Sequence, residues 1–385
     1  MKKAFKTRAV SALLVSAFTL LSFNPPEKIK NVPSPLVKTA KIQVAILLDV
    51  SNSMDGLIEQ AKAQLWNMVS VMGKAKCNEV TPEIEIALYE YGRTTNSVSE
   101  GYVKQIKGFT SDLDALSQDL FKLTTQGGDE YCGHVIYTSL SKLNWDNSST
   151  SYKVIFIAGN EDFLQGDILY TKACAEAKKK GVIVNTIYCG DKAQGIREHW
   201  NLNAECGNGS YTNINQDAKI EDIPTPYDSV VFALNGKLNG TYIAYGKDGE
   251  ASFAAQASVD QTNYHLNKSS AAKRVAIKGK KELYKNTTWD LVDASEKDST
   301  FYAKVDTKTL PDDLKNKSRK ELQKIIKEKT AERNQIQKEI ETVNTKREAF
   351  IAAEKAKIAT HTQTLETEVE KIIKQQAKQF NMIIQ

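Results

Sequence analysis

Runs of apolar residues alternate with amphipathic stretches along the first half of the chain. Residues 42–48 and 152–158 are almost wholly apolar, and 182–188 is a third such run. This composition is typical of strands that are buried on both faces of a parallel sheet. Residues 83–91 alternate apolar and polar positions at their start, as a strand does, while apolar residues from 57 to 72 recur at helical spacing.

Further helical patterns fill the intervals between these strands. We expect helices over residues 113–123, after the Gly127-Gly128 turn as far as Leu140, and over 171–180, with Gly181 as the residue that ends the last one. A short strand is predicted at 210–214. Strand and helix in regular alternation predict an α/β fold with a doubly wound, mostly parallel sheet. Such sheets bind ligands in the crevice beyond the carboxyl ends of their strands.

The second half of the chain is predicted to be helical. Thr225, Pro226 and Asp228 have the order of a helix start, and a helix is expected from there through Leu238. A glycine-rich turn at 245–249 ends it, and a further helical stretch is predicted over 251–285. No chemistry is evident here, so this region is interpreted as a structural extension.

From Ser318 to the end the sequence contains neither glycine nor proline, and Ser318 and Glu321 form a capping box. Apolar residues recur at three-four spacing, but polar residues interrupt the seam at Arg347, Glu354 and His361. The pattern predicts one long helix, or two helices folded on each other, in an imperfect coiled coil. The apolar end, 380–384, is expected to dock on a partner or on the chain itself.

The N-terminus has the order of an export signal. Basic residues between Lys2 and Arg8 precede an apolar stretch at 9–23, which is short for a membrane span. No clean cleavage site follows, so both a cleaved signal and an uncleaved anchor remain open. We therefore expect an exported protein of the periplasm, cell envelope or extracellular space. The predicted organisation is a signal peptide at 1–23, a linker at 24–40, the α/β domain at 41–216, the helical extension at 217–310 and the C-terminal helix at 311–385.

Composition narrows the classes of function. The chain has 385 residues, of which 41% are hydrophobic and 26% charged, which excludes wholesale disorder and a polytopic membrane protein. The formal charge is +5, but four of the positive charges precede the apolar N-terminal stretch. The remainder is close to neutral and carries no basic stripe with aromatics, so no nucleic-acid partner is expected. Five cysteines without metal-ligand spacing predict buried thiols and one disulfide, and an odd count leaves one thiol unpaired even if two disulfides form.

One motif at the end of the first strand suggests chemistry. Asp49, Ser51 and Ser53 place a carboxylate and two hydroxyls at alternating positions of one loop. Hard divalent cations such as Mg²⁺ favour oxygen ligands of this kind. Asp and Ser are also preferred helix caps, so the alternative is an ordinary capping turn. The position at the carboxyl end of an apolar strand favours the cation site.

These residues resemble the von Willebrand factor A (VWA) domain family over about residues 41–215. The resemblance rests on the strand that ends in Asp49-Val50-Ser51-Asn52-Ser53-Met54, on the diglycine at 127–128 and on the strand at 154–158. Segments 127–133, 157–161 and 289–294 are similar to those of a bacterial subgroup of exported VWA-domain proteins without an established activity. The resemblance implies a Rossmann-like fold and a metal-ion-dependent adhesion site.

The resemblance also assigns the ligands of that site. Asp49, Ser51 and Ser53 match its first loop. Its second loop usually supplies a threonine, where this chain has Asp129 followed by Glu130. Its third loop usually supplies an aspartate, which is missing at 158–160; Glu161 or Asp162 can substitute for it. An acid in the second loop neutralises more of the cation's charge, so the metal would attract an acidic partner side chain less.

Three hypotheses of function follow. The first is a non-enzymatic protein-binding module that uses a divalent cation, with Mg²⁺ as the first candidate, and an acidic partner side chain at the metal. The second is a structural protein whose C-terminal helix self-associates and whose α/β domain is a metal-free platform. The third is a hydrolase that uses Glu130, His134 or Glu161, but no catalytic constellation or small-molecule site is evident. We expect that the protein is not an enzyme.

Overall fold

The computed structural model describes residues 40–218, 222–357 and 364–384. These residues belong to one compact unit, Thr39–Gln385. The predicted signal peptide, nearly all of the predicted linker and His361 lie outside the described residues. Among the described helices, none has both the length and the apolar composition to cross a bilayer.

The α/β part is built on a six-stranded sheet with the order β4-β3-β1-β5-β6-β7. All neighbouring strands are parallel except β3 and β4, which are antiparallel. The strands are β1 (Lys41–Asp49), β3 (Glu83–Tyr91), β4 (Lys104–Thr110), β5 (Tyr152–Gly159), β6 (Ile183–Cys189) and β7 (Tyr211–Ile214). The predicted fold class, an α/β fold with a doubly wound and mostly parallel sheet, is therefore confirmed.

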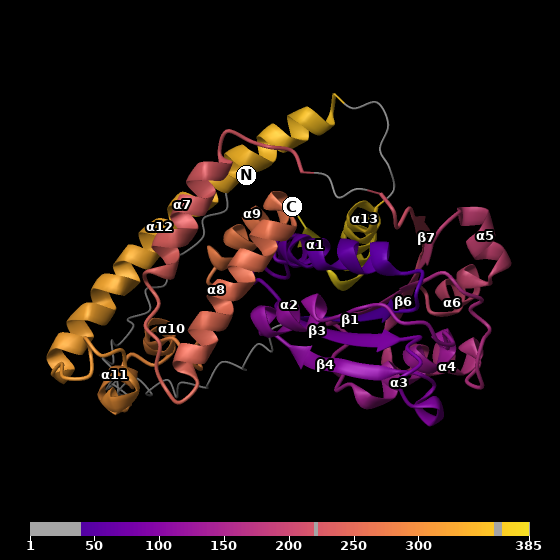
Figure 1. The fold of residues 1–385 in the computed structure, drawn as a ribbon, viewed down its shortest axis with the longest axis horizontal. Helices are drawn as coiled ribbons and strands as arrows, with labels where there is room; N and C mark the ends of the chain where they lie inside the picture. The colour runs from indigo at the N-terminus through magenta and orange to yellow at the C-terminus, as the bar shows by residue number, and fades with distance from the viewer. Residues whose placement is uncertain (1–39, 219–221, 358–363, 385) are drawn as a thin grey trace, which may run out of the picture. The chain divides into compact units, whose positions relative to one another are not determined.

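The apolar runs occupy the central strands because helices cover both faces of the sheet. Val44 and Leu48 of β1 contribute to the core on one face, and Ala45 and Leu47 to the core on the other. Figure 1 shows the two helical layers. On one face lie α1 (Asp55–Met72), α2 (Leu113–Phe121) and α13 (Leu365–Ala377), and on the other α3 (Cys132–Lys142), α4 (Tyr170–Lys180) and α6 (Trp200–Cys206).

The sequence did not predict the antiparallel edge strand β4. Its residues are exposed or half-buried, so they carry no apolar run. The strand forms because the exposed edge of β3 offers backbone hydrogen bonds. Its pairing with β3 is irregular, with register shifts between Ile86 and Tyr89.

Within its described residues the helical extension forms five α-helices, and the predicted helical stretch 251–285 is divided between two of them. These are α7 (Asp228–Asn239), α8 (Gly249–Leu266), α9 (Lys268–Lys278), α10 (Leu291–Lys297) and α11 (Phe301–Lys304). Asn267 has φ −162°, which ends α8, and its side chain accepts a hydrogen bond from the Ser270 amide (2.8 Å) to start α9. This Asn cap is the signal that the continuous-helix prediction missed.

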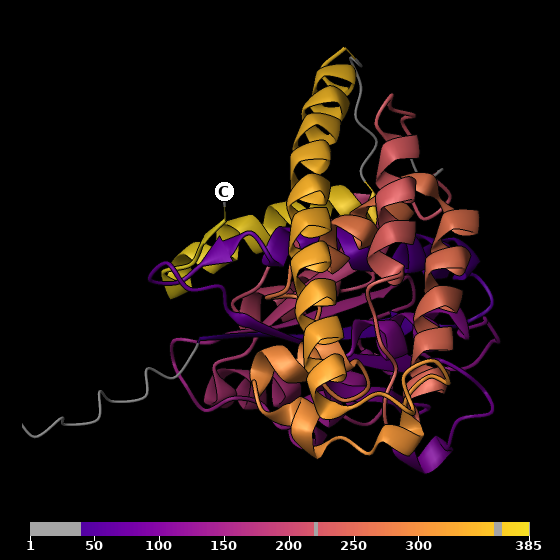
Figure 2. The same cartoon turned by 90° about the vertical axis from the view of Figure 1, so that its left-hand side faces the viewer.

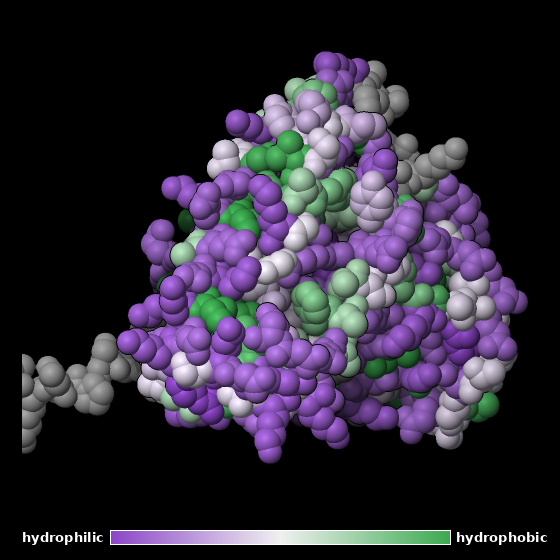
Figure 3. All heavy atoms as spheres, turned by 60° about the vertical axis from the view of Figure 1, so that its left-hand side comes forward, coloured by the Kyte–Doolittle hydropathy of each residue, from purple (hydrophilic) through white to green (hydrophobic). Residues whose placement is uncertain are grey.

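Helix α12 (Arg319–Lys355) is the long predicted helix, and its capping box at Ser318 is present. It lies beside α7 in two perpendicular views (Figures 1 and 2). Two of its buried positions are arginines, Arg333 and Arg347. The Arg347 side chain donates to Asp228 at the start of α7 (2.8 Å). The surface on this side of the molecule is mostly hydrophilic, with separate small hydrophobic patches (Figure 3).

Helix α13 packs on α1 of the α/β part, whereas α12 packs on the extension. The two helices therefore pack on different parts of the chain. They do not fold on each other as a coiled coil, which was one of the two predicted arrangements. After α13 the chain adds the strand β8 (Ile383–Ile384), antiparallel to β2 (Ala75–Lys76), and Met382 is fully buried. The apolar end thus docks on its own chain.

Candidate cation site at the carboxyl end of the sheet

Asp49 is the last residue of β1, and its side chain is fully buried. Its Oδ1 accepts a hydrogen bond from the Ser51 amide (2.8 Å), while its Oδ2 is buried without a hydrogen-bond partner. Burial raises the pKa of Asp49 to about 7, although hydrogen bonds from Ser51 oppose the shift. A buried carboxylate with a free oxygen is costly unless a positive group satisfies it.

Two glycines make room for this carboxylate. Gly92 follows β3 with φ +83°, and a Cβ there would lie 3.0 Å from Asp49 Oδ1 and 3.0 Å from the Cγ of Glu130. Gly159 ends β5, and a Cβ there would lie 3.0 Å from Asp49 Oδ2 and 2.5 Å from the Tyr91 hydroxyl. Any side chain at either position would enter the space around the carboxylate. Neither glycine was predicted as a site residue, since a single glycine after a strand carries little signal.

Glu130 brings a second buried carboxylate to the same place. Its side chain lies against Gly92, and the residue is 6% exposed. Burial raises the pKa of Glu130 to about 8, and the negative charges of Asp49 and Glu161 add to the shift. The Ser51 Oγ is also buried without a well-formed hydrogen bond, although it lies close enough to both carboxylates to lower their pKa values in part. Asp49, Ser51 and Glu130 form the inner set.

The loops that hold the inner set are tied together by hydrogen bonds. The Asn52 side chain accepts from the Gly127 amide (2.7 Å), and the Val50 carbonyl accepts from the Gln126 amide (2.7 Å). The diglycine loop is thus fixed to the loop after β1. This contact explains how Glu130, distant in sequence, reaches Asp49.

The other predicted ligands lie outside the inner set. Ser53 is exposed, and its hydroxyl accepts a hydrogen bond from Asn160 (3.1 Å), which joins the loop after β1 to the loop after β5. Asp129 and Glu161 are exposed and act on Glu130 through their negative charge. Asp162, the alternative to Glu161, pairs with His199 (3.1 Å).

The inner set has the oxygen donors that a hard cation such as Mg²⁺ requires. Within the described parts of the chain, no three His, Cys, Asp or Glu side chains gather into a metal-ligand group. Mg²⁺, however, keeps several waters and is commonly held by one or two carboxylates. Asp49 and Glu130 supply two carboxylates and Ser51 a hydroxyl, and two of their oxygens have no other partner. All of these donors are oxygens.

His134, the histidine of the hydrolase hypothesis, and His199, the other histidine of the α/β part, both have other neighbours. His134 packs against Gly101, where a Cβ would lie 2.3 Å from its Nδ1, and burial lowers the pKa of His134. His199 pairs with Asp162 (3.1 Å). The described contacts therefore place neither histidine on the Ser51 hydroxyl, which lacks a hydrogen-bond partner.

Three of the five cysteines, Cys77, Cys132 and Cys189, are free thiols, while Cys174 is disulfide-bonded. Cys132 is buried, and its Sγ lies 3.8 Å from the Tyr91 hydroxyl. Burial holds the pKa values of Cys132 and Cys189 well above the usual range for a thiol. These thiols are therefore structural rather than reactive.

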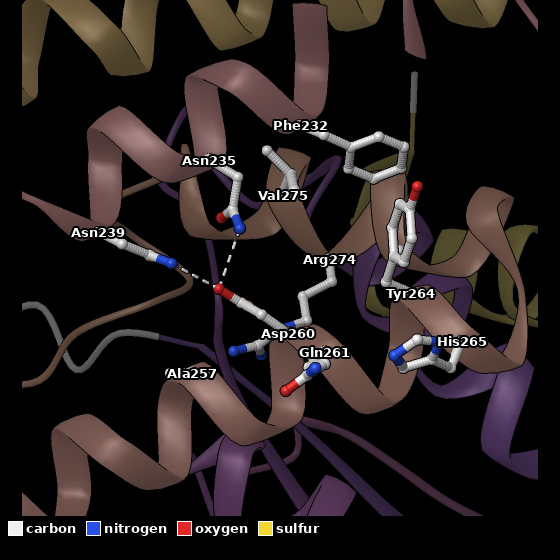
Figure 4. A pocket seen from close by; sticks show the side chains of 11 residues that line it. Phe232, Asn235, Asn239, Ala257, Asp260, Gln261, Tyr264, His265, Arg274 and Val275 are labelled. Carbon is white, nitrogen blue, oxygen red and sulfur yellow. Dashed lines mark hydrogen bonds and ion pairs between the residues drawn. The ribbon is translucent and has the colours of Figure 1, made fainter. Parts of the chain in front are cut away.

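A second polar cluster, in the helical extension, was not predicted from the sequence. It borders a cavity of about 440 Å³ between α7, α8 and α9 (Figure 4). Asp260 points toward Asn235 (3.0 Å) and Asn239 (2.8 Å) and also accepts from Arg274 (2.6 Å) and Lys278 (2.7 Å). Burial opposes its charge, but Arg274 and Lys278 hold the pKa of Asp260 well below its usual range. Arg274 also pairs with Asp114, so two carboxylates balance two cations and the cluster is structural.

No protein-family model matches the chain, and no curated protein matches it. Among solved structures, proximal thread matrix protein 1 from the mussel byssus, with a zinc-occupied MIDAS motif, is 14% identical with a TM-score of 0.35; the match covers 46% of this chain and 42% of that protein. The SpRpn10 VWA domain is 16% identical with a TM-score of 0.35, covering 47% and 91%.

An aerotolerance-related membrane protein from Bacteroides fragilis, carrying multiple mutations to serine, is 17% identical with a TM-score of 0.31. That match covers 46% of this chain and 93% of the other. All of these similarities extend over less than half of this chain, and the chain spans about 42% of the length of the mussel protein.

Proposed function

We propose that this protein is an exported binding module that recognises a protein partner through a divalent cation held by Asp49, Ser51 and Glu130. One observation carries the proposal: Asp49 Oδ2 and Ser51 Oγ are buried without partners beside a second buried carboxylate. When bound, the cation supplies the positive charge that these oxygens lack and an open coordination position for a partner group.

The other predicted site residues lie on the exposed side of the inner set. Ser53 and Asn160 are hydrogen-bonded to each other across two loops, and Glu161 and Asp129 carry charge beside the buried acids. Asp49, Ser51 and Glu130 would hold the cation, and Ser53 and Glu161 would lie beside it on the exposed side.

Binding rather than catalysis is the activity that these contacts favour. A nucleophilic mechanism needs a base within hydrogen-bond reach of the nucleophile. His134 and His199 instead contact Gly101 and Asp162, and the two carboxylates beside the Ser51 hydroxyl, Asp49 and Glu130, are the proposed ligands of the cation. We therefore propose that the protein acts without turnover.

Export is proposed from the basic-then-apolar pattern of residues 2–23. The disulfide at Cys174 supports this location, because disulfides persist in oxidising compartments. Self-association through the C-terminal helix has less support. The buried stripe of α12 already packs on the extension, and α13 packs on α1.

The test is calorimetric titration of the chelator-treated full chain with Mg²⁺, Mn²⁺ and Ca²⁺. We expect saturable binding that is lost in Asp49→Asn and weakened in Glu130→Gln. Glu328→Gln, an exposed acid on α12, is the control and should bind like the unaltered chain. Full binding by Asp49→Asn would disprove the cation site.

A further inference from the structure

Acidic side chains dominate the segments around the candidate cation site. We name these the edge segments; they are residues 49–55, 92–103, 124–131, 160–170, 190–199 and 215–218. Together they carry eleven acidic and three basic side chains, whereas the whole chain has a formal charge of +5. The negative charge is therefore concentrated at one edge of the sheet.

Little of this charge is neutralised by basic residues of the edge segments. Arg93 pairs with Glu90 of β3 (3.2 Å), outside these segments. Asp129, Glu161 and Asp167 are all exposed. Asp129 directly precedes Glu130, so this exposed charge lies on the same loop as the buried carboxylate.

The edge segments also hold apolar side chains that stay exposed among the described residues. Four large hydrophobic residues are exposed here: Val98 (66%), Leu164 (39%), Leu169 (60%) and Ile196 (48%). Exposed apolar groups beside polar ones are typical of interaction surfaces.

Contacts join the edge segments into one surface. The rings of Tyr102 and Tyr131 meet edge-to-face with their centroids 5.5 Å apart, which connects the segment after β3 to the start of α3. A Cβ on Gly133 would lie 2.0 Å from the Ile168 carbonyl, so the segment after β5 lies across the same helix start. The Phe163 amide donates to the Glu198 carbonyl (2.9 Å), which adds the segment after β6.

The charge around the site decides which partner this surface accepts. A divalent cation balances the charges of Asp49 and Glu130, and the exposed acids then leave the surface negative. A partner carboxylate that approached the metal would meet this negative field, whereas an ammonium or guanidinium group would be attracted. Asp129 and Glu130, which stand where the resemblance predicts a neutral threonine, supply part of this negative charge.

We propose that the partner is a protein segment that presents lysine or arginine side chains flanked by apolar ones, and that the edge segments bind it. This inference rests on the proposed function, because it names the partner of the same site. The basic groups pair with Asp129, Glu161 and Asp167, and the apolar groups pack on Val98, Leu164, Leu169 and Ile196. A neutral backbone carbonyl of the same segment is the group that would take the open position at the cation. This partner replaces the acidic partner side chain expected from the sequence.

The test uses an array of short, random-sequence peptides, probed with the labelled full chain in the presence of Mg²⁺. We expect the bound peptides to be enriched in Lys and Arg next to Leu, Ile or Phe. The peptide that binds best is then titrated in solution at low and high salt. Its affinity should fall as salt rises, because exposed charges are screened.

Two triple variants separate a specific effect from a general effect of charge. Asp129→Asn/Glu161→Gln/Asp167→Asn should weaken binding of that peptide by about tenfold, the effect of three exposed pairs of modest strength. Glu328→Gln/Glu332→Gln/Glu341→Gln removes the same charge from exposed positions of α12 and should leave the affinity unchanged. Equal losses in the two variants would overturn the proposal.

The remaining outcomes distinguish this inference from the proposed function. Enrichment of Asp and Glu among the bound peptides would overturn the inference and leave the cation site intact. Mg²⁺ binding without any bound peptide would do the same. Failure of Mg²⁺ to bind would instead overturn the proposed function, and Lys/Arg enrichment that persisted with chelator would then support the acidic surface alone.

Discussion

The Arg333 guanidinium of α12 donates to Asp290 (2.7 Å) and to Asp293 (2.6 Å), at the start of α10. Arg333 and Asp290 are both buried, and Arg333 also donates to the hydroxyl of Thr241 (2.9 Å). The guanidinium lies over the ring of Tyr242, 4.2 Å from its centroid. This ion pair joins the long C-terminal helix to the extension.

Replacing Arg333 with alanine should therefore destabilise the protein strongly. The change leaves the buried carboxylate of Asp290 without its cation, which costs about 3–5 kcal/mol in comparable pairs. Lys327→Ala, at an exposed position of the same helix, is the control and should change the free energy of unfolding by less than about 0.5 kcal/mol. Urea denaturation measures both. A loss below about 1 kcal/mol for Arg333→Ala would show that the pair contributes little.

The candidate cation site predicts a pH dependence of stability. In the absence of a cation, the pKa of Asp49 is about 7 and that of Glu130 about 8 in the folded chain, both above their ordinary values of 3.8 and 4.5. At pH values between the ordinary pKa values and the raised ones, the folded state therefore binds more protons than the unfolded state. The stability that these groups contribute is fully present below their unfolded pKa values and is lost as the pH rises through the folded ones.

Saturating Mg²⁺ should flatten this dependence, because it supplies the positive charge that the carboxylates lack. Thermal unfolding of the chelator-treated chain from pH 5 to pH 9, with and without Mg²⁺, measures the effect. Asp49→Asn should reduce the slope without added metal. A slope that is the same in the variant, and with or without Mg²⁺, would contradict the assignment.

Gly159→Ala should impair cation binding. The added Cβ would lie 2.5 Å from the Tyr91 hydroxyl and 3.0 Å from Asp49 Oδ2, so the carboxylate must move. Gly236→Ala is the matched control: it lies inside α7 with nothing within 4 Å of the added Cβ, and it should stabilise the helix by about 0.5–1 kcal/mol. Calorimetric titration with Mg²⁺ and thermal unfolding of both variants test the pair. Unchanged Mg²⁺ affinity in Gly159→Ala would mean that the cation lies elsewhere.

Helix α13 should be an integral part of the α/β core. Ile373 is fully buried, and truncation to alanine should cost about 2–5 kcal/mol, as for other buried aliphatic residues. Lys371→Ala, two residues away and exposed, should be nearly neutral. Denaturation by urea compares the two. Equal stability of the two variants would mean that α13 is only loosely attached.

Local patterns were sufficient for much of the fold. The apolar runs predicted the central strands because both faces of the sheet are covered, and the capping box at Ser318 marked the start of α12. Asp49 was predicted as a site residue because it ends such a strand. The break between α8 and α9 and the edge strand β4 were not predicted. Asn267 divides one predicted helix, and β4 has no apolar pattern because it lies at the exposed edge of the sheet.

Contacts between distant residues decided the rest. Arg347 interrupts the seam of α12 in the sequence, yet it pairs with Asp228, which lies 119 residues away. The sequence cannot show that pairing, because a buried charge is stable only where folding brings its partner to it. Glu130 joins Asp49 for the same reason, through the hydrogen bond between Asn52 and Gly127. The sequence therefore determined which segments form strands and helices and where the first carboxylate lies. Tertiary packing decided which charges meet, because the burial that makes each pairing necessary exists only in the folded chain.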